Sequence, residues 1–572
     1  MTKKKLSIIK RCIPILEWLP SYDVRKNLIN DIVGGLTVGF IHVPQGMAYA
    51  SLAGLKPVYG LYTSLFPGLI YMLFGTSRHV SLGVFAVVSL MCGSCNIRVT
   101  QEIMQNNNLT SIEDRREISV EVVKSLGLLV GLFQIILGLL KADYLVSYLS
   151  DQIIVGFTTG AAVHVFTAQL NKILGINLPR HNGFGKLFKS YYDMTKSILD
   201  HQVNIYTLII SIVTIIVLYT FKYHITPKLC ANTKFPIPYD LFVIIVGTVA
   251  SEVFLFNQNF HVKIVGHIPT GLPSPKIPDV KIFQYLVSDA LAIAVVSIVV
   301  TVSMGKVFGK KHNYKIDARQ EFFALGMTES FCSMFPVWPS STALARTIIN
   351  ENAGTKTQLS ALFSASVLIL VLFFIGPFLE PLPTCLLSCI VIVALRGMFM
   401  QLTNFGPSFW KISKIDWLIF TTTFLSTVIY DVVPGLFIGV VAGLLLSILR
   451  IQRTPLIVDE IDLENNSKSL RITYPSSLLY FNCDTFEKSI NEIISARFTD
   501  QDEKINMLEK NQNVVFDMSG IGNIDVSGAS LLVKLTKDLK NDHGVLLELH
   551  NPTDVARQFL SKHPNFQQLN IS

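Results

Sequence analysis

The sequence is poor in charged residues. Only 15% of its 572 residues are Asp, Glu, Lys or Arg, and half are hydrophobic. This composition excludes an ordinary soluble globular protein and a disordered chain. Three windows, 203–221, 359–379 and 432–449, contain no charge at all. Each approaches or exceeds the ~20 apolar residues that cross a bilayer, so the sequence predicts a protein with many membrane spans.

Several other signals are missing. There is no phosphate-binding loop with its lysine, so we expect no ATP-driven step and no enzyme. Cys92 and Cys95 have the spacing of zinc ligands, but no second pair accompanies them, so we expect no metal site. No basic face is interleaved with aromatic residues, which argues against nucleic acid as a partner. We likewise expect no cofactor.

The N-terminal segment 1–30 carries no signal for cleavage. Three lysines precede the apolar stretch 6–20, which is too short to span and lacks small residues for a signal peptidase. We interpret 1–30 as a cytosolic amphipathic segment. The net charge of +8 is modest, but basic residues cluster between 306 and 319, which predicts a cytosolic loop. The stretch 172–196 is also basic, although counting spans places it outside, where we expect short interfacial helices.

Hydropathy predicts about twelve to fourteen spans. The segments are 31–51, 58–74, 81–95, 121–140, 144–168, 203–223, 239–257, 285–308, 320–337, 341–351, 359–379, 384–400, 416–430 and 433–450. Two of them, 81–95 and 341–351, are short and occupy the third place in each half. Paired short segments at matching positions indicate the binding site of a transporter, although ordinary short helices would look the same.

The first span carries a polar kink. Residues 35–50 are apolar apart from a few positions, yet Pro44 and Gln45 interrupt them. A buried glutamine in a membrane needs a partner or a watery cavity, so Gln45 indicates either a solute site or a contact between helices. Tyr49 lies four residues later, on the same helix face as Gln45.

Five motifs in order carry a resemblance to a known family. Residues 44–50 (PQGMAYA), 58–62 (VYGLY), 75–83 (GTSRHVSLG), 265–275 (VGHIPTGLPSP) and 354–359 (GTKTQL) resemble the SulP anion transporters. This sulfate permease group is called solute carrier family 26 in animals. The resemblance covers nearly the whole chain and implies a polytopic all-α membrane domain with 14 spans, arranged as a 7+7 inverted repeat with two short half-helices.

After residue 450 charges become frequent and the pattern changes. Strands are predicted at 471–481, 513–518 and 545–549, and helices at 484–497, 527–542 and 553–560, which gives a small α/β domain. Residues 515–528 resemble the core of a STAS domain. We therefore divide the chain into 1–30, a transmembrane transport domain at 31–450, and a cytosolic STAS domain at 451–572. Ser527 occupies the place of a serine that is phosphorylated in bacterial relatives of this domain, but we interpret it as a helix cap.

The starts of the two short segments are candidates for an anion site. An anion in hydrocarbon needs hydrogen-bond donors and positive potential, and helix N-termini supply both. Arg346 lies beside one of these starts, although lipid snorkelling or a salt bridge with Glu329 would also explain it. The family's Ser-x-Ser-Arg run reads Ala343-Leu-Ala-Arg346 here, without either serine, which puts anion selectivity in doubt.

The resemblance completes the candidate site. An aromatic residue on the third helix lines the site in the family, and Phe85 matches it, although a lone Tyr or Phe is more often core filler. The predicted substrate-binding residues are Gln45, Tyr49, Phe85, Ala86, Val87, Leu344, Ala345 and Arg346. Asn108 begins a glycosylation sequon in a loop that the span count places outside.

The sequence therefore predicts a secondary active anion transporter. By resemblance it exchanges sulfate, chloride, bicarbonate or oxalate by an elevator movement. It is expected in the plasma membrane with both termini cytosolic, surrounded by lipid, as a homodimer. The alternatives are an uncoupled anion channel or voltage-driven motor, a nucleobase–cation symporter, and a STAS-based scaffold or sensor with an inactive membrane part. Lys306 stands where family members that resemble proton-coupled sulfate carriers tend to place a glutamate, although an anchor at the cytosolic helix end would also explain it. In either case we expect transport without proton coupling.

Overall fold

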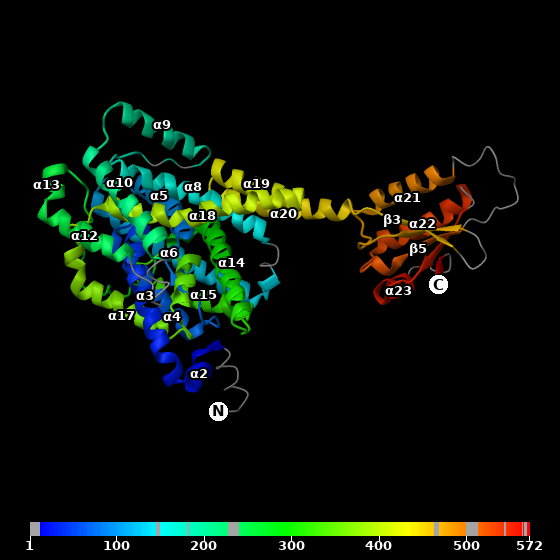
Figure 1. Ribbon diagram of the computed structural model, residues 1–572, viewed down its shortest axis with the longest axis horizontal. Coiled ribbons are helices and arrows are strands. Elements are labelled where there is room, and N and C mark those ends of the chain that lie inside the picture. The colour runs from blue at the N-terminus through cyan, green and yellow to red at the C-terminus, as the bar shows by residue number, and fades with distance from the viewer. Residues whose placement is uncertain are drawn as a thin grey trace. The chain divides into compact units, whose positions relative to one another are not determined.

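The chain forms two compact units, Met1–Ala442 and Gly443–Ser572. The computed structural model describes residues 12–144, 149–179, 181, 183–226, 239–462, 468–498, 513–542, 545–562, 564 and 569–571. The first unit is helical and the second is a sheet with helices (Figure 1). The predicted domain boundaries at 30 and 450 stay proposals.

The first unit has a helix at each predicted span. Its helices are α2 (Ile15–Trp18), α3 (Val24–Ala50), α4 (Pro57–Phe74), α5 (Ala86–Asn106), α6 (Ile112–Leu139), α8 (Asp151–Ile173), α9 (Lys186–Leu199), α10 (Ile205–Thr220), α12 (Tyr239–Val253), α13 (Phe256–Phe260), α14 (Val287–Lys311), α15 (Ala318–Cys332), α16 (Leu344–Asn352), α17 (Ser360–Leu370), α18 (Thr384–Ile412) and α19 (Lys414–Ile429). Helix α20 (Val432–Gln452) begins in the first unit and ends in the second. In the described part of the chain, eight helices are individually long and apolar enough to cross a membrane. The mostly helical membrane fold is therefore confirmed.

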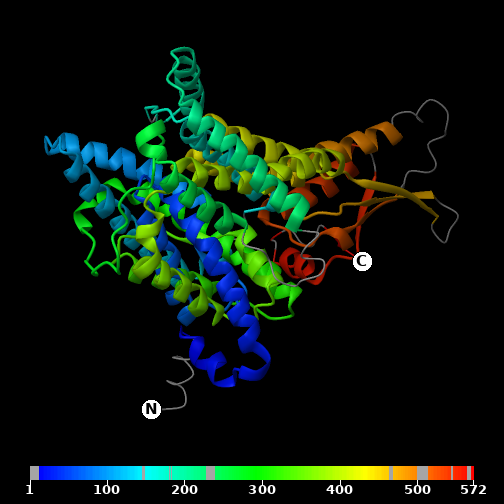
Figure 2. The same cartoon turned by 60° about the vertical axis from the view of Figure 1, so that its left-hand side comes forward.

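The first long helix begins earlier than predicted. The Asp23 carboxylate accepts hydrogen bonds from the backbone N–H groups of Arg25 (3.1 Å) and Lys26 (3.3 Å), so α3 starts at Val24 rather than at 31. Its first turns are polar, which hid them from a search for apolar runs. Together with α2, this end of α3 extends beyond the rest of the helical unit in both views (Figures 1 and 2). Residues 1–11 of the expected N-terminal segment lie outside the described residues.

The third span is not short, so the prediction of 81–95 is wrong at both ends. Leu82–Gly83 forms a strand, and α5 then runs for 21 residues to Asn106. The helix continues through polar residues because they have partners. Asn96 Nδ2 donates to the carbonyl of Ala53 (3.0 Å), and Arg98 Nη2 donates to Asp289 (2.6 Å). Of the two predicted half-helices, α16 is the short one, with nine residues.

The basic stretch at 172–196 includes part of α9, a strongly amphipathic helix, and its expected position at the membrane interface stays a prediction. Gly185, in the left-handed region at φ +70°, precedes it. Lys186 at its start forms an ion pair with Asp431, which ties this segment to the loop before α20. The helix protrudes from the helical body in both views (Figures 1 and 2).

The second unit is built on a five-stranded sheet in the order β3-β4-β5-β6-β7. The strands are β3 (Ile457–Asp462), β4 (Lys468–Thr473), β5 (Asn513–Asp517), β6 (Leu546–His550) and β7 (Asn570–Ile571), with helices α21 (Cys483–Phe498), α22 (Val526–Asp542) and α23 (Asp554–Leu560). β3 pairs antiparallel with β4, and the remaining pairs are parallel. The predicted alternation of strands and helices is confirmed, whereas β3 and β7 escaped prediction.

The cap of α22 differs from the prediction. Asp525 Oδ1 accepts the backbone N–H of Gly528 at 2.9 Å, and its other oxygen accepts the N–H of Tyr480 at 2.7 Å. Ser527 is exposed one residue inside the helix. The interpretation of Ser527 as the cap is therefore wrong, because the carboxylate before it satisfies the free N–H group first.

Candidate functional site

Two residue pairs bring the starts of α5 and α16 together. The strand β1 (Leu82–Gly83) pairs antiparallel with β2 (Ser341–Thr342), so that Leu82 faces Thr342 and Gly83 faces Ser341. All four residues are buried. The two strands come from opposite halves of the helical unit, and each leads directly into a helix. The N-termini of α5 and α16 are therefore held close to one another.

The pairing depends on a glycine. Gly83 has φ +154°, and a Cβ atom there would lie 2.6 Å from His42 Cε1 on α3 and 3.3 Å from Arg346 Nη2. A side chain at this position would collide with the imidazole ring. The absence of a side chain thus lets β1, α3 and α16 meet at one point.

Both helix N-termini lack a side-chain cap. Phe85 precedes α5 and Ala343 precedes α16, and neither side chain accepts a hydrogen bond from its helix. The first backbone N–H groups of a helix have no partner within the helix, and they carry about half a positive charge together. Where Ser, Asp or Asn would normally occupy them, this chain leaves them free to bind an anion.

Arg346, in the first turn of α16, is completely buried. Its Nε donates to Ser81 Oγ (3.0 Å) and Nη2 to the Ser81 carbonyl (3.1 Å). Nη1 donates to Gln45 Oε1 (3.2 Å) and to the Val84 carbonyl (3.0 Å). These bonds occupy four of the five N–H groups of a guanidinium. The side chain thus joins α3, the residues flanking β1, and α16.

No carboxylate neutralises this charge among the described residues. Glu329 accepts instead from the backbone N–H (2.9 Å) and the hydroxyl (2.6 Å) of Ser340. The alternative of an Arg346–Glu329 salt bridge is therefore wrong, and complete burial also contradicts snorkelling to the lipid interface. A buried charge without a counter-ion is costly, so the site favours a nearby anion.

The other predicted residues surround the two helix starts. Gln45 is partly buried and bonds to Arg346, while Tyr49 is 7% exposed one helical turn later. Phe85, Ala86 and Val87 are buried at the start of α5. By contrast, Leu344 is 37% exposed and Ala345 is also exposed, so the N-terminus of α16 is accessible from one side.

Two buried carboxylates of α15 position the turns before the helix starts. Glu321 accepts from Tyr71 Oη (2.7 Å) and from the backbone N–H and hydroxyl of Thr76 (2.7 and 2.5 Å), ahead of β1. Glu329 holds Ser340, ahead of β2, as described above. Sequence analysis did not assign this role to either residue, since the partners of Glu321 lie 245 and 250 residues away and Ser340 lies beyond the end of α15. The only available signal was an acidic residue inside an apolar stretch.

The motif at 354–359 forms hydrogen bonds to α3 and to the residues before β1. Asp31 of α3 accepts from the backbone N–H groups of Lys356 (2.7 Å) and Thr357 (3.0 Å). Gln358 Nε2 donates to the carbonyls of Ser77 and Val80, both at 2.8 Å. The motif therefore fixes α3 and the approach to β1 without touching the candidate anion position.

A small polar cavity of about 20 Å³ lies beside this site. His42, Ser64, Ser81 and Gln358 are among its lining residues. His42 Nδ1 and Ser64 Oγ are buried and have no protein partner among the described residues. The volume suits one water molecule with polar neighbours.

Comparison with known proteins identifies the family. Residues 28–423 match the model of the sulfate permease family, and residues 460–572 match that of the STAS domain. The chain belongs to the sulfate permease family. This membership confirms the predicted resemblance and describes an anion transporter rather than an enzyme, with a polytopic membrane domain followed by a STAS domain.

Several relatives of this sulfate permease family member are known. It is 37% identical to prestin of Danio rerio over 509 residues, which cover 86% of this chain and 68% of the relative. It is 37% identical to the sulfate transporter of Homo sapiens over 469 residues, which cover 79% of this chain and 63% of the relative. The matched regions thus span about two thirds of these relatives' own lengths.

Solved structures of the family have the same fold. The structure of SLC26A9 superimposes with a TM-score of 0.87 at 27% identity, covering 99% of this chain and 92% of the other. The transmembrane domain of the cyanobacterial bicarbonate transporter BicA gives a TM-score of 0.57 at 20% identity over 73% of this chain and 97% of that chain, which shows the fold alone.

Proposed function

We propose that this family member is a secondary active transporter that binds its anion between the N-termini of α5 and α16. One observation carries the proposal: the β1–β2 pair holds two uncapped helix N-termini together beside a buried arginine that has no carboxylate partner among the described residues. Four protein acceptors engage Arg346, so it supplies positive potential, while backbone N–H groups supply the direct hydrogen bonds.

The predicted site residues take defined roles in this proposal. The N–H groups at Ala86, Val87, Leu344 and Ala345 bind the anion, Phe85 and Tyr49 form its apolar walls, and Gln45 orients Arg346. Weak, shared hydrogen bonds suit a transporter because the anion must also leave. The chain itself needs no cofactor for this step.

We propose that the site moves as one body, as an elevator mechanism requires. α15 holds both turns through its two glutamates, and Asp31 and Gln358 attach α3 to the same assembly. These ties leave the anion position rigid relative to its surrounding helices. Alternating access then requires movement of the whole assembly against the remaining helices, which form the gate.

The proposed substrates are small anions of the sulfate, chloride, bicarbonate and oxalate class. The names of the sulfate transporter relatives support sulfate. Ala343 and Ala345 provide no hydroxyl donors, so we expect recognition through backbone N–H groups and charge, and therefore modest discrimination between anions.

We further propose a plasma-membrane homodimer with both termini cytosolic. In this orientation Asn108 is extracellular. Asn108 lies in the turn between α5 and α6, with φ +52°. Its side chain is exposed there and is therefore accessible to glycosylation. The lipid bilayer surrounds the helical unit.

Flux measurements in proteoliposomes test the transport proposal. Purified protein should exchange radiolabelled sulfate or oxalate for internal chloride, with little accompanying electrical conductance. A conductance far above the exchange flux would show a channel, and voltage-dependent charge movement without flux would show a motor. No flux and no charge movement, in a correctly folded sample, would leave the scaffold alternative.

A further inference from the structure

A second, much larger cavity lies away from the candidate anion site. Its volume is about 1550 Å³, and none of the eight predicted substrate-binding residues lines it. Its walls are the N-terminal end of α4, the C-terminal end of α5, the first half of α6 and the segment 269–285. Small-molecule pockets commonly measure about 300–1,000 Å³, so this cavity suits an extended organic molecule rather than a small inorganic anion.

The wall formed by 269–285 is firmly attached to the helices. The backbone N–H of Asp279 donates to Glu121 Oε1 (2.7 Å), and Ser125 donates to the Asp279 carbonyl (2.9 Å). The backbone N–H of Lys276 donates to the carbonyl of Met334 (2.7 Å), and the Tyr62 hydroxyl donates to the carbonyl of Gly271 (3.2 Å). These bonds from both ends of the segment make the cavity part of the folded core of this region.

Positive charge dominates the lining. Six basic residues face three acidic residues, namely Lys56, Arg115, Arg116, Lys124, Lys276 and Lys281 against Glu117, Glu121 and Asp279. Within the described residues, only Lys124 of the six takes part in an ion pair. The other five basic side chains have no carboxylate partner among the described residues and can therefore pair with a ligand.

Lys124 is the decisive side chain. It is 4% exposed, and its ammonium lies 3.0 Å from Glu121 Oε2. An ammonium has three N–H donors, and this contact is its one hydrogen bond to a described residue. Glu121 takes one of these donors, so the remaining two are available to an acceptor group of a ligand at this end of the cavity.

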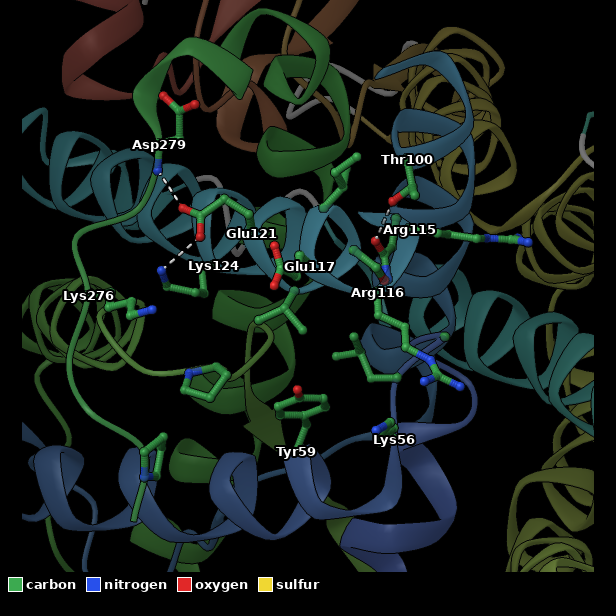
Figure 3. Close-up of a pocket in the computed structure, with 18 of the residues that line it drawn as sticks. Lys56, Tyr59, Thr100, Arg115, Arg116, Glu117, Glu121, Lys124, Lys276 and Asp279 are labelled. Carbon is green, nitrogen blue, oxygen red and sulfur yellow. Dashed lines mark hydrogen bonds and ion pairs between the residues drawn. The ribbon is translucent and has the colours of Figure 1, made fainter. Parts of the chain in front are cut away.

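The charges are arranged at two ends. In Figure 3 the amines of Lys124 and Lys276 lie on one side, and Arg116 and Lys56 lie on the other. Glu117 and Tyr59 lie between the two pairs, whereas Arg115 is directed away from them. The lining of the cavity also includes apolar residues such as Val58, Ile103 and Ile118. A carboxylate at the centre disfavours a third negative group there.

We infer that this cavity binds an elongated organic dianion, with an acidic group at each end and an apolar body between. Lys124 and Lys276 bind one acidic group, and Arg116 and Lys56 bind the other. Glu117 rejects molecules with negative charge along their whole length. In the proposed membrane orientation, the cavity opens to the extracellular side, next to the loop that carries Asn108.

Calorimetric titration of the purified full chain in lipid nanodiscs tests this site. The probes are a series of α,ω-dicarboxylates from hexanedioate to dodecanedioate, each compared with the monocarboxylate of equal length. At least one dicarboxylate should bind about tenfold more tightly than its monocarboxylate, a difference of about 1.4 kcal/mol, because its second carboxylate adds a charged hydrogen bond. Lys276→Met and Arg116→Met should each remove about this tenfold preference.

Two further variants make the result decisive. Lys189→Met, on exposed α9, removes a lysine that does not line the cavity and should leave dicarboxylate binding unchanged. Arg346→Gln, at the candidate anion site, should also leave it unchanged. Equal binding of dicarboxylates and monocarboxylates across the series would overturn the inference. The inference would also be overturned if Arg346→Gln lost dicarboxylate binding. It would be overturned as well if both Lys276→Met and Arg116→Met kept the preference for dicarboxylates.

Discussion

At the scale of single residues, Arg346 combines two roles that are usually separate. Its charge is buried with no carboxylate partner among the described residues. Its N–H groups donate hydrogen bonds to Gln45, Ser81 and the Val84 carbonyl around the start of α5. Removal of the side chain would therefore change both the potential at the anion position and the shape of the site.

Arg346→Gln should reduce anion flux by about 10- to 100-fold, because the lost attraction between the positive charge and the anion is comparable to one charged hydrogen bond, about 1.5–3 kcal/mol. Arg346→Lys should retain part of the flux, since it keeps the charge but not the planar group of donors. The measurement is radiotracer uptake at matched surface amount. Wild-type flux and apparent affinity in Arg346→Gln would refute the assignment.

Lys306 tests proton coupling. It is exposed on α14, which continues to Lys311, so its position fits a cytosolic anchor as well as a residue near the anion path. The wild type should take up sulfate without proton drive. In Lys306→Glu, the carboxyl gains a proton as pH falls towards its reference pKa of about 4.3, so sulfate uptake should rise as external pH falls. Uptake against external pH in both forms is the measurement. Identical profiles would support the anchor, and strong proton-driven uptake by the wild type would contradict the prediction.

At the scale of elements, the β1–β2 pair sets the distance between two helix N-termini. Gly83→Ala places a Cβ atom 2.6 Å from His42 and forces a non-glycine residue to φ +154°. Backbone strain of about 1–3 kcal/mol should lower thermal stability and displace the start of α5, with loss of most flux.

The double variant Gly83→Ala/His42→Ala separates the two causes. It removes the collision but keeps the strained backbone, so stability and flux should recover in part. Thermal unfolding in detergent and tracer flux measure this recovery. If Gly83→Ala alone has the thermal stability and flux of the wild type, the close approach of β1 and α3 is not required for a working site.

The sequence predicts the helices of this fold better than their ends. Long apolar runs such as 359–379 indicate spans directly, because burial in lipid requires them. The extension of α5 beyond residue 95 was missed, since its polar residues depend on partners in distant segments, such as Asp289 for Arg98. The strands β1 and β3 were missed because pairing, not local pattern, creates them.

The candidate site is predictable only in part. Gln45 and Arg346 stood out as polar residues in apolar surroundings, and the structure joins them by a hydrogen bond. Ser81 and the Val84 carbonyl carried no such signal, although they bind the same guanidinium. The binding roles of all eight predicted residues stay predictions until flux is measured.

At the scale of the whole molecule, the resemblance predicts a homodimer with contacts in the region from about 459 to 572. Cross-linking of the full chain in lipid should give a dimer, and a chain shortened before this region should give less of it. The control is cross-linking after denaturation, which should yield monomer. A monomer in both mild detergent and lipid would contradict this prediction.

The two glutamates of α15 also constrain how this protein can be recombined with its relatives. Glu321 holds the turn at Thr76, in the first half of the chain, and Glu329 holds the turn at Ser340, in the second. A chimaera joined between the halves would therefore pair one parent's α15 with the other parent's first turn. Such a chimaera keeps a working site only if both parents have compatible residues at 71, 76 and 321, so exchange of the complete helical unit is the safer design.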